Sequence, residues 1–219
     1  MNIIFRTQGV SLLSIITLIA LAYFVSILVA MHKLRSDLKP LSQYISEYAL
    51  GNYGKLAKSG FVIYGIAILG VYLNLTISLS SGFKSNIGLM FIATWGISNI
   101  ITGFFDVDPK DEPLSSRGIV HLTATIIGVV SSVIGLILLS FSFAIKGVIP
   151  LIAFVTILTA IVASALVVVL LIGFICGFAL KYCCNLPWIL LLLHSYTGLL
   201  ERLVVGISVV WLAMVAYWI

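Results

Sequence analysis

Six apolar segments take up most of this sequence, and each is long enough to cross a membrane. We predict them at about Gly9–Met31, Phe61–Ser80, from the polar turn Gly82–Asn86 to Phe104, from Gly118, Pro150–Leu180 and from Gly198 onward. A helix needs about 20 apolar residues to span the hydrocarbon core. The segments therefore predict an all-α polytopic membrane bundle of about six transmembrane helices, with residues 1–219 forming a single integral membrane domain.

Composition agrees with this fold class. Only 9% of the residues are charged, whereas soluble domains carry about 25%. The Lys and Arg residues are spread through loops without a dense basic tract, so we expect no nucleic-acid partner.

The loop after the first segment contains apolar residues at helical spacing. They are Leu41, Tyr44, Ile45, Tyr48 and Ala49. Pro40 suits a first helical turn and Gly51 suits a C-terminal cap. We predict a short amphipathic helix at the membrane interface. The last apolar run is too long for one untilted crossing. We therefore predict an interfacial stretch at Trp188–Tyr196 before the sixth crossing.

All seven acidic residues and all three histidines map to one end of the predicted bundle. They are Asp37, Glu47, Asp106, Asp108, Asp111, Glu112, Glu201, His32, His121 and His194. Of the twelve basic residues, only Arg6, Lys84 and Lys146 map to the opposite end. The positive-inside rule places the acid-rich end in the cytoplasm of an inner, or plasma, membrane.

The first candidate for chemistry combines Asp106 and Asp108 with His121. A membrane hairpin brings the exit of the third segment near the start of the fourth, where carboxylate and imidazole can form an acid–base pair or part of a metal site. The alternative is structural, because the acids can cap the fourth segment and pair with Arg117 or Lys110.

Glu201 and Arg202 are candidate ligand-binding residues at the start of the last crossing. Charge at that depth is costly without a partner. With Gly198 as the cap, Glu201 can satisfy free N–H groups of its own helix. We expect Arg202 to pair with Asp106, Asp108 or a lipid phosphate.

The segment with Tyr44, Glu47 and Tyr48 has two interpretations. Tyrosines four residues apart are typical of an aromatic anchor at the interface. Alternatively, the segment is a lid over a polar site, and these three residues then contribute to ligand binding.

We predict no metal site and no particular cofactor. His32, His121 and His194 lie toward one face, but His32 and His194 fall at or beyond helix ends, which disfavours haem or a metal centre. No nucleophile elbow, phosphate-binding glycine loop or HExxH signature is present, so whether the protein is an enzyme stays open.

Three stretches resemble the family called domain of unknown function 998, small bacterial and archaeal membrane proteins with about six helices. They are QYISEYALGNYGKLAKSGF, GFFDVDPKDEPLSSRGIVHLTA and GLLERLVVGISVVWLAM. The family's Phe-Pro-x-Asp and Gly-x-x-His elements resemble Phe105, Asp108, Gly118 and His121. Asp106 stands where proline is common, so the family's aspartate corresponds to either Asp106 or Asp108.

The end of the resemblance falls on Gly198, Glu201, Arg202 and Trp211. It raises the weight of these positions but implies no activity. A shorter similarity to the Frag/DRAM/Sfk group, which is implicated in lipid handling, is too brief to transfer a function.

Our leading hypothesis is a protein that binds or acts on a membrane lipid or small amphipathic ligand. Its pocket would combine Asp106, Asp108, His121, Glu201 and Arg202 beneath the Tyr44–Tyr48 helix. A structural or assembly subunit, with a homo-oligomeric or membrane-protein partner, is the alternative. A small transporter comes third, because the mid-helix polar residues look scattered; they are Asn74, Thr76, Asn99, Thr102 and Ser131.

Overall fold

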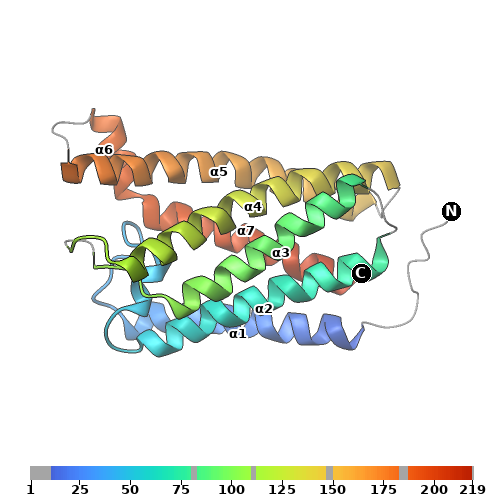
Figure 1. The fold of residues 1–219 in the computed structure, drawn as a ribbon, viewed down its shortest axis with the longest axis horizontal. Helices are drawn as coiled ribbons and strands as arrows, with labels where there is room; N and C mark the ends of the chain where they lie inside the picture. Colours follow the sequence, from blue (N-terminus) through green and yellow to red (C-terminus); the bar gives the residue numbers. More distant parts are fainter. Residues whose placement is uncertain (1–10, 80–82, 110–111, 147–149, 183–186, 219) are drawn as a thin grey trace.

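Six long helices run side by side across the computed structural model, which describes residues 11–79, 83–109, 112–146, 150–182 and 187–218 (Figure 1). They are α1 (Leu12–Leu34), α2 (Gly54–Ser78), α3 (Phe83–Phe104), α4 (Ser116–Lys146), α5 (Pro150–Tyr182) and α7 (Thr197–Trp218). All six are long and apolar enough to cross a membrane. The predicted all-α bundle with six transmembrane helices is confirmed.

Two short helices complete the fold. The helix α6 (Trp188–Ser195) precedes α7 and matches the predicted interfacial stretch, with exposed apolar side chains such as Trp188. The second, η1 (Ile45–Ala49), is a 3-10 helix in the first loop. It begins later than we predicted, because residues 38–43 form hydrogen-bonded turns in place of a regular helix.

The helix η1 of the first loop packs its apolar side chains against the end of the bundle. Ile45 and Tyr48 are 2% and 1% exposed and pack with Ile27, Met31 and Ala57. Burying such large side chains stabilises a structure by about 1.5–3 kcal/mol each. Hydrophobic burial therefore holds η1 under the end of the bundle.

The α2 helix begins at Gly54, earlier than the predicted start at Phe61. A helix does not have to stop where its apolar stretch stops, and here its first turns carry Lys55 and Lys58. Gly54 lies so close to η1 that a Cβ atom would sit 2.3 Å from the carbonyl oxygen of Ala49.

The long helices close into a ring. Successive neighbours are α1–α2, α2–α3, α3–α4, α4–α5, α5–α7 and α7–α1, and α2 also contacts α7. The core between them includes Tyr64, Ile92 and Trp211, and the Trp211 indole donates to Thr156 Oγ1 of α5 at 3.0 Å. The helices α2, α3, α4, α5 and α7 therefore enclose a common interior.

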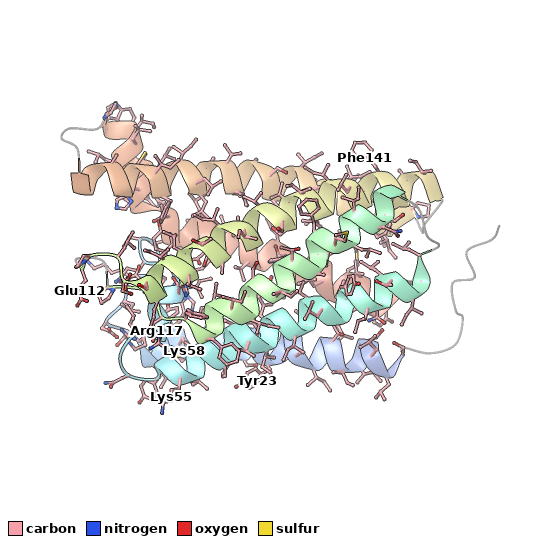
Figure 2. All side chains as sticks on the ribbon, viewed as in Figure 1. Tyr23, Lys55, Lys58, Glu112, Arg117 and Phe141 are labelled. Carbon is pink, nitrogen blue, oxygen red and sulfur yellow. The ribbon has the colours of Figure 1, made fainter. Side chains whose placement is uncertain are left out.

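The described charged residues gather at one end of the bundle. Lys55, Lys58, Glu112 and Arg117 lie at the left in Figure 2, whereas Phe141 lies toward the other end of α4. The same end carries η1 and α6, while α1 begins and α7 ends at the right (Figure 1). Arg6, Lys110 and Asp111 lie outside the described residues, as do the side chains of Lys84, Lys146 and Lys181.

Candidate functional site

The first loop is held against the start of α7 by close backbone contact. Leu199 donates its backbone N–H to the Leu41 carbonyl at 3.0 Å. A Cβ atom on Gly198 would sit 2.4 Å from the Gln43 carbonyl oxygen and 2.6 Å from that of Pro40. Only glycine allows this approach without a shift of the loop.

Glu201 caps a different helix from the one we predicted. Its Oε2 accepts the backbone N–H of Ile45 at 2.6 Å, so it satisfies the first residue of η1 and not the start of α7. Within the described residues no hydrogen bond reaches its second oxygen, Oε1.

Arg202 has different partners from those we expected. Its Nη1 donates to the carbonyls of Gln43 and Gly198 at 2.8 and 2.9 Å, and Nη2 donates to the Tyr48 hydroxyl at 3.2 Å. The guanidinium also stands 5.5 Å from the Tyr48 ring centre, and Nε donates to His32 Nε2 at 3.2 Å. These contacts hold the loop and do not involve Asp106 or Asp108.

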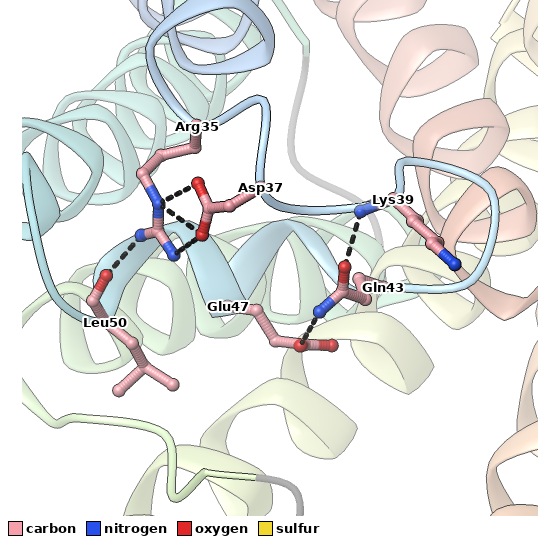
Figure 3. Close-up of polar contacts among 6 residues, drawn as sticks. All are labelled: Arg35, Asp37, Lys39, Gln43, Glu47 and Leu50. Atoms are coloured by element: carbon pink, nitrogen blue, oxygen red, sulfur yellow. Dashed lines mark hydrogen bonds and ion pairs between the residues drawn. The ribbon is translucent and has the colours of Figure 1, made fainter.

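Polar contacts brace the loop itself (Figure 3). Arg35 forms an ion pair with Asp37 at 2.8 Å and donates to the Leu50 carbonyl. Hydrogen bonding to Arg35 lowers the pKa of Asp37, and the same bond raises the pKa of Arg35. Glu47 accepts from the Tyr44 backbone and from Gln43 Nε2.

The two tyrosines of this segment pack against neighbouring side chains. Tyr48 is buried, and Tyr44 is partly buried with its ring 6.4 Å from that of Phe174. Burial raises the pKa of Tyr44 to about 12, so its hydroxyl stays neutral at physiological pH.

Asp108 fixes the start of α4. It accepts the backbone N–H of Ser115 at 2.8 Å and the Ser115 hydroxyl at 2.6 Å, and the same hydroxyl oxygen accepts the N–H of Gly118. This is the capping role of the structural alternative. The Asp108 carboxylate also fills the space where a side chain at Gly118 would begin.

The predicted contact between His121 and a carboxylate is not formed. His121 Nδ1 bonds the Phe105 carbonyl at 2.8 Å. Asp106 forms an ion pair with Lys58 of α2, a partner that we did not predict. Asp106, Asp108 and His121 therefore each have a different partner, and the buried imidazole of His121 is not paired with either aspartate.

A cavity of about 80 Å³ lies between the helices, and both His121 and Glu201 line it. Its polar side chains come from η1, α2, α3, α4 and α7. They are Ser46, Tyr64, Ser98, Asn99, Thr102, His121, Thr125, Ser132, Glu201 and Ser208. Asp106, Asp108 and Arg202 are not among the lining residues. Of the five residues of the predicted pocket, His121 and Glu201 therefore line the same cavity.

Our sequence reasoning missed most of the polar lining. The signal was present as helical spacing, because His121, Thr125, Gly128 and Ser132 follow one another at intervals of three or four residues and share one face of α4. The same spacing relates Glu201 to Ser208 through Val204 and Val205 on α7. The sequence analysis named His121 and Glu201 but not the other polar residues of these two stripes.

The histidines do not form a common site. His32 accepts from Arg202, and His194 Nδ1 lies 3.3 Å from the Gly173 carbonyl oxygen. Within the described residues, no group of three or more His, Cys, Asp or Glu side chains gathers that could hold a metal ion.

The sequence matches the family described as "Protein of unknown function (DUF998)" over residues 18–218, nearly the whole chain. No curated protein and no solved structure matches it.

Proposed function

Because this chain belongs to the DUF998 family, whose description assigns no activity, we propose a function from its own cavity: it holds the polar end of a lipid or small amphipathic ligand within the membrane. The family and the six apolar helices establish a multi-pass membrane protein. Ligand binding is the step that we add.

The observation that carries the proposal is a polar stripe facing an interior space. Polar side chains inside a membrane protein are costly and tend to mark functional sites. Here the stripes of α3, α4 and α7 meet at one cavity, with Glu201 and His121 among its lining residues.

The size of the cavity favours a head group over a whole lipid. A water molecule needs about 10–15 Å³ on the same measure, so about 80 Å³ accommodates a group of a few heavy atoms. Apolar lining residues such as Phe61, Leu170 and Val205 suit the adjoining part of an alkyl chain.

A side entrance between α4 and α5 would admit such a chain. Leu170 is the sole lining residue from the described part of α5, and Thr125 and Val129 of α4 are partly exposed. The residues of η1 would cover the cavity from that end, with Ile45 and Ser46 among its lining.

We further propose the plasma membrane as the location, with the acid-rich end toward the cytoplasm. The distribution of Lys and Arg supports this orientation. Membrane lipids are the proposed partners.

Filling the cavity tests the function. Thr125→Phe places a ring into the cavity, whereas Thr123→Phe makes the same change two residues away, on the exposed side of α4. Native mass spectrometry of protein purified in a non-ionic detergent should show a co-purified amphiphile in wild type and Thr123→Phe, and its loss from Thr125→Phe.

Equal retention by all three proteins would contradict the proposal. Size-exclusion profiles must first show that each variant is folded. If Thr125→Phe does not fold, Thr125→Leu gives a smaller obstruction at the same position.

A further inference from the structure

Three of the hydroxyl groups that line the cavity donate their protons within their own helices. Thr102 donates to Asn99, Thr125 donates to His121 and Ser132 donates to Val129, each to a backbone carbonyl at 2.7–2.9 Å. Each oxygen therefore faces a ligand mainly as an acceptor.

The amide and the imidazole of the lining also offer acceptors. Asn99 Nδ2 donates one of its two N–H groups to the Trp95 carbonyl at 2.9 Å, so its Oδ1 can accept and its second N–H can donate. His121 bonds the Phe105 carbonyl through Nδ1, and that nitrogen must carry the proton because a carbonyl only accepts. Ser46, Ser98 and Ser208 stay able to donate or to accept.

The charge of the lining has one sign. Among the described residues that line the cavity, Glu201 is the acidic one and none is Lys or Arg. Arg202, the next residue in the sequence, donates hydrogen bonds to the first loop, to the Gly198 carbonyl and to His32. The second carboxyl oxygen of Glu201, Oε1, thus adds an acceptor to this surface when the carboxyl group is ionised, and a cation bound beside it would stabilise the ionised form.

Aromatic rings form part of the wall. Tyr64 stacks on Phe24 with ring centres 4.2 Å apart and meets Trp95 edge-on at 6.0 Å, and all three line the cavity. The Tyr64 hydroxyl is buried and makes no hydrogen bond of normal geometry, although Ser208 lies beside it. Aromatic faces attract cations by their quadrupole.

We infer that this cavity selects a primary ammonium group carried on an apolar chain. The inference rests on the proposed function and names the class of its ligand. Three N–H donors of an ammonium match the acceptors of Asn99, Thr102 and Glu201, and its charge matches the carboxylate and the rings. A carboxylate or phosphate head group would be repelled by an ionised Glu201 and would meet no Lys or Arg among the described lining residues.

The test compares three probes with the same alkyl chain: dodecylammonium, dodecyltrimethylammonium and dodecanoate. At neutral pH the amine is protonated, since alkylammonium groups such as that of lysine have pKa values of about 10.4. Native mass spectrometry of wild type in a non-ionic detergent should show dodecylammonium bound about tenfold more tightly than dodecanoate, a difference of about 1.4 kcal/mol. Dodecyltrimethylammonium, which has no N–H donor, should bind more weakly than dodecylammonium.

Glu201→Gln should remove this preference while keeping an oxygen to accept from Ile45. The matched control is Asp37→Asn, which neutralises an acid at the same end of the bundle but outside the cavity. It should bind dodecylammonium like wild type. An unchanged preference in Glu201→Gln would overturn the inference.

Other outcomes separate this inference from the proposed function. Binding of dodecanoate as tight as that of dodecylammonium, lost in Thr125→Phe, would keep the ligand site and overturn its specificity. Equal binding of dodecyltrimethylammonium, or displacement of dodecylammonium by sodium ions, would overturn the assignment of a primary ammonium. If Thr125→Phe leaves the binding of every probe unchanged, the proposed function itself fails.

Discussion

The backbone N–H of Ile45 donates to Glu201 Oε2 at 2.6 Å, although 156 residues separate the two in sequence. This bond ties η1 to α7 beside the cavity, so Glu201 has both a structural contact and an oxygen left for a ligand. Two substitutions of Glu201 are therefore needed, one that removes the hydrogen-bond acceptor and one that keeps an acceptor but removes the charge.

We expect Glu201→Ala to lower the free energy of unfolding by about 1–3 kcal/mol, because the buried N–H of Ile45 loses its acceptor. Glu201→Gln keeps an acceptor and should lose much less. Equilibrium unfolding in mixed micelles measures both. A loss in Glu201→Gln as large as in Glu201→Ala would show that the charge, and not the hydrogen bond, stabilises this end of the bundle.

Gly198→Ala should loosen the first loop. The added Cβ meets two carbonyl oxygens of the loop, and overpacking of this kind costs about 1–3 kcal/mol. Gly206→Ala on the same helix is the control, since a Cβ there has no neighbour within 4 Å. It should be neutral or stabilising, because alanine is favoured over glycine in helices by about 1 kcal/mol.

Limited proteolysis of the segment from Pro40 to Tyr44 reports the effect of Gly198→Ala directly. Cleavage should accelerate in Gly198→Ala and stay at the wild-type rate in Gly206→Ala. Equal rates in both variants would contradict the role of the close approach.

Asp108→Ala should destabilise the protein without changing ligand retention. Loss of the carboxylate removes the acceptor that positions Ser115 at the start of α4, and loss of a cap costs about 1 kcal/mol. Thermal unfolding and native mass spectrometry on the same sample measure the two effects. A folded Asp108→Ala protein that has lost its ligand would restore the aspartate to the binding site.

The Arg35–Asp37 pair should make a small, pH-dependent contribution to stability. Arg35 lowers the pKa of Asp37 in the folded state. The contribution is therefore present above the unfolded pKa, about 3.9 for aspartate, and is lost as the pH falls through the folded value. Asp37→Asn should lower the melting temperature slightly at pH 7, and the difference from wild type should vanish below the folded pKa. A difference of the same size at both pH values would rule out the ion pair as its cause.

The crossings were predictable because their cause is local. A run of apolar residues is stable in hydrocarbon only as a helix, so Pro150 and Gly198 mark helix starts within a residue of the observed ones. The end of the bundle at which each described charge lies followed from the same segments.

The partners of the polar groups were not predictable in this way. Arg202 contacts the Gln43 carbonyl, 159 residues away, and nothing in its local sequence distinguishes that oxygen from a lipid phosphate. Asp106 pairs with Lys58 for a similar reason, since the register between α2 and α3 is set by packing. The polar stripe of α4 that faces the cavity could have been predicted, because the helical spacing from His121 to Ser132 depends on the local sequence alone.

The position of α7 in the ring has a consequence for biogenesis. It leaves the ribosome after the other five long helices that the structure describes, yet it contacts α1, α2, α5 and η1. Until α7 inserts, the first loop cannot make its contacts with Gly198, Glu201 and Arg202. The cavity beside the polar residues of α4 is then open on the side that α7 covers. The nascent chain therefore holds five helices around an incomplete interior, and insertion of the sixth both closes the bundle and seats a loop translated some 150 residues earlier.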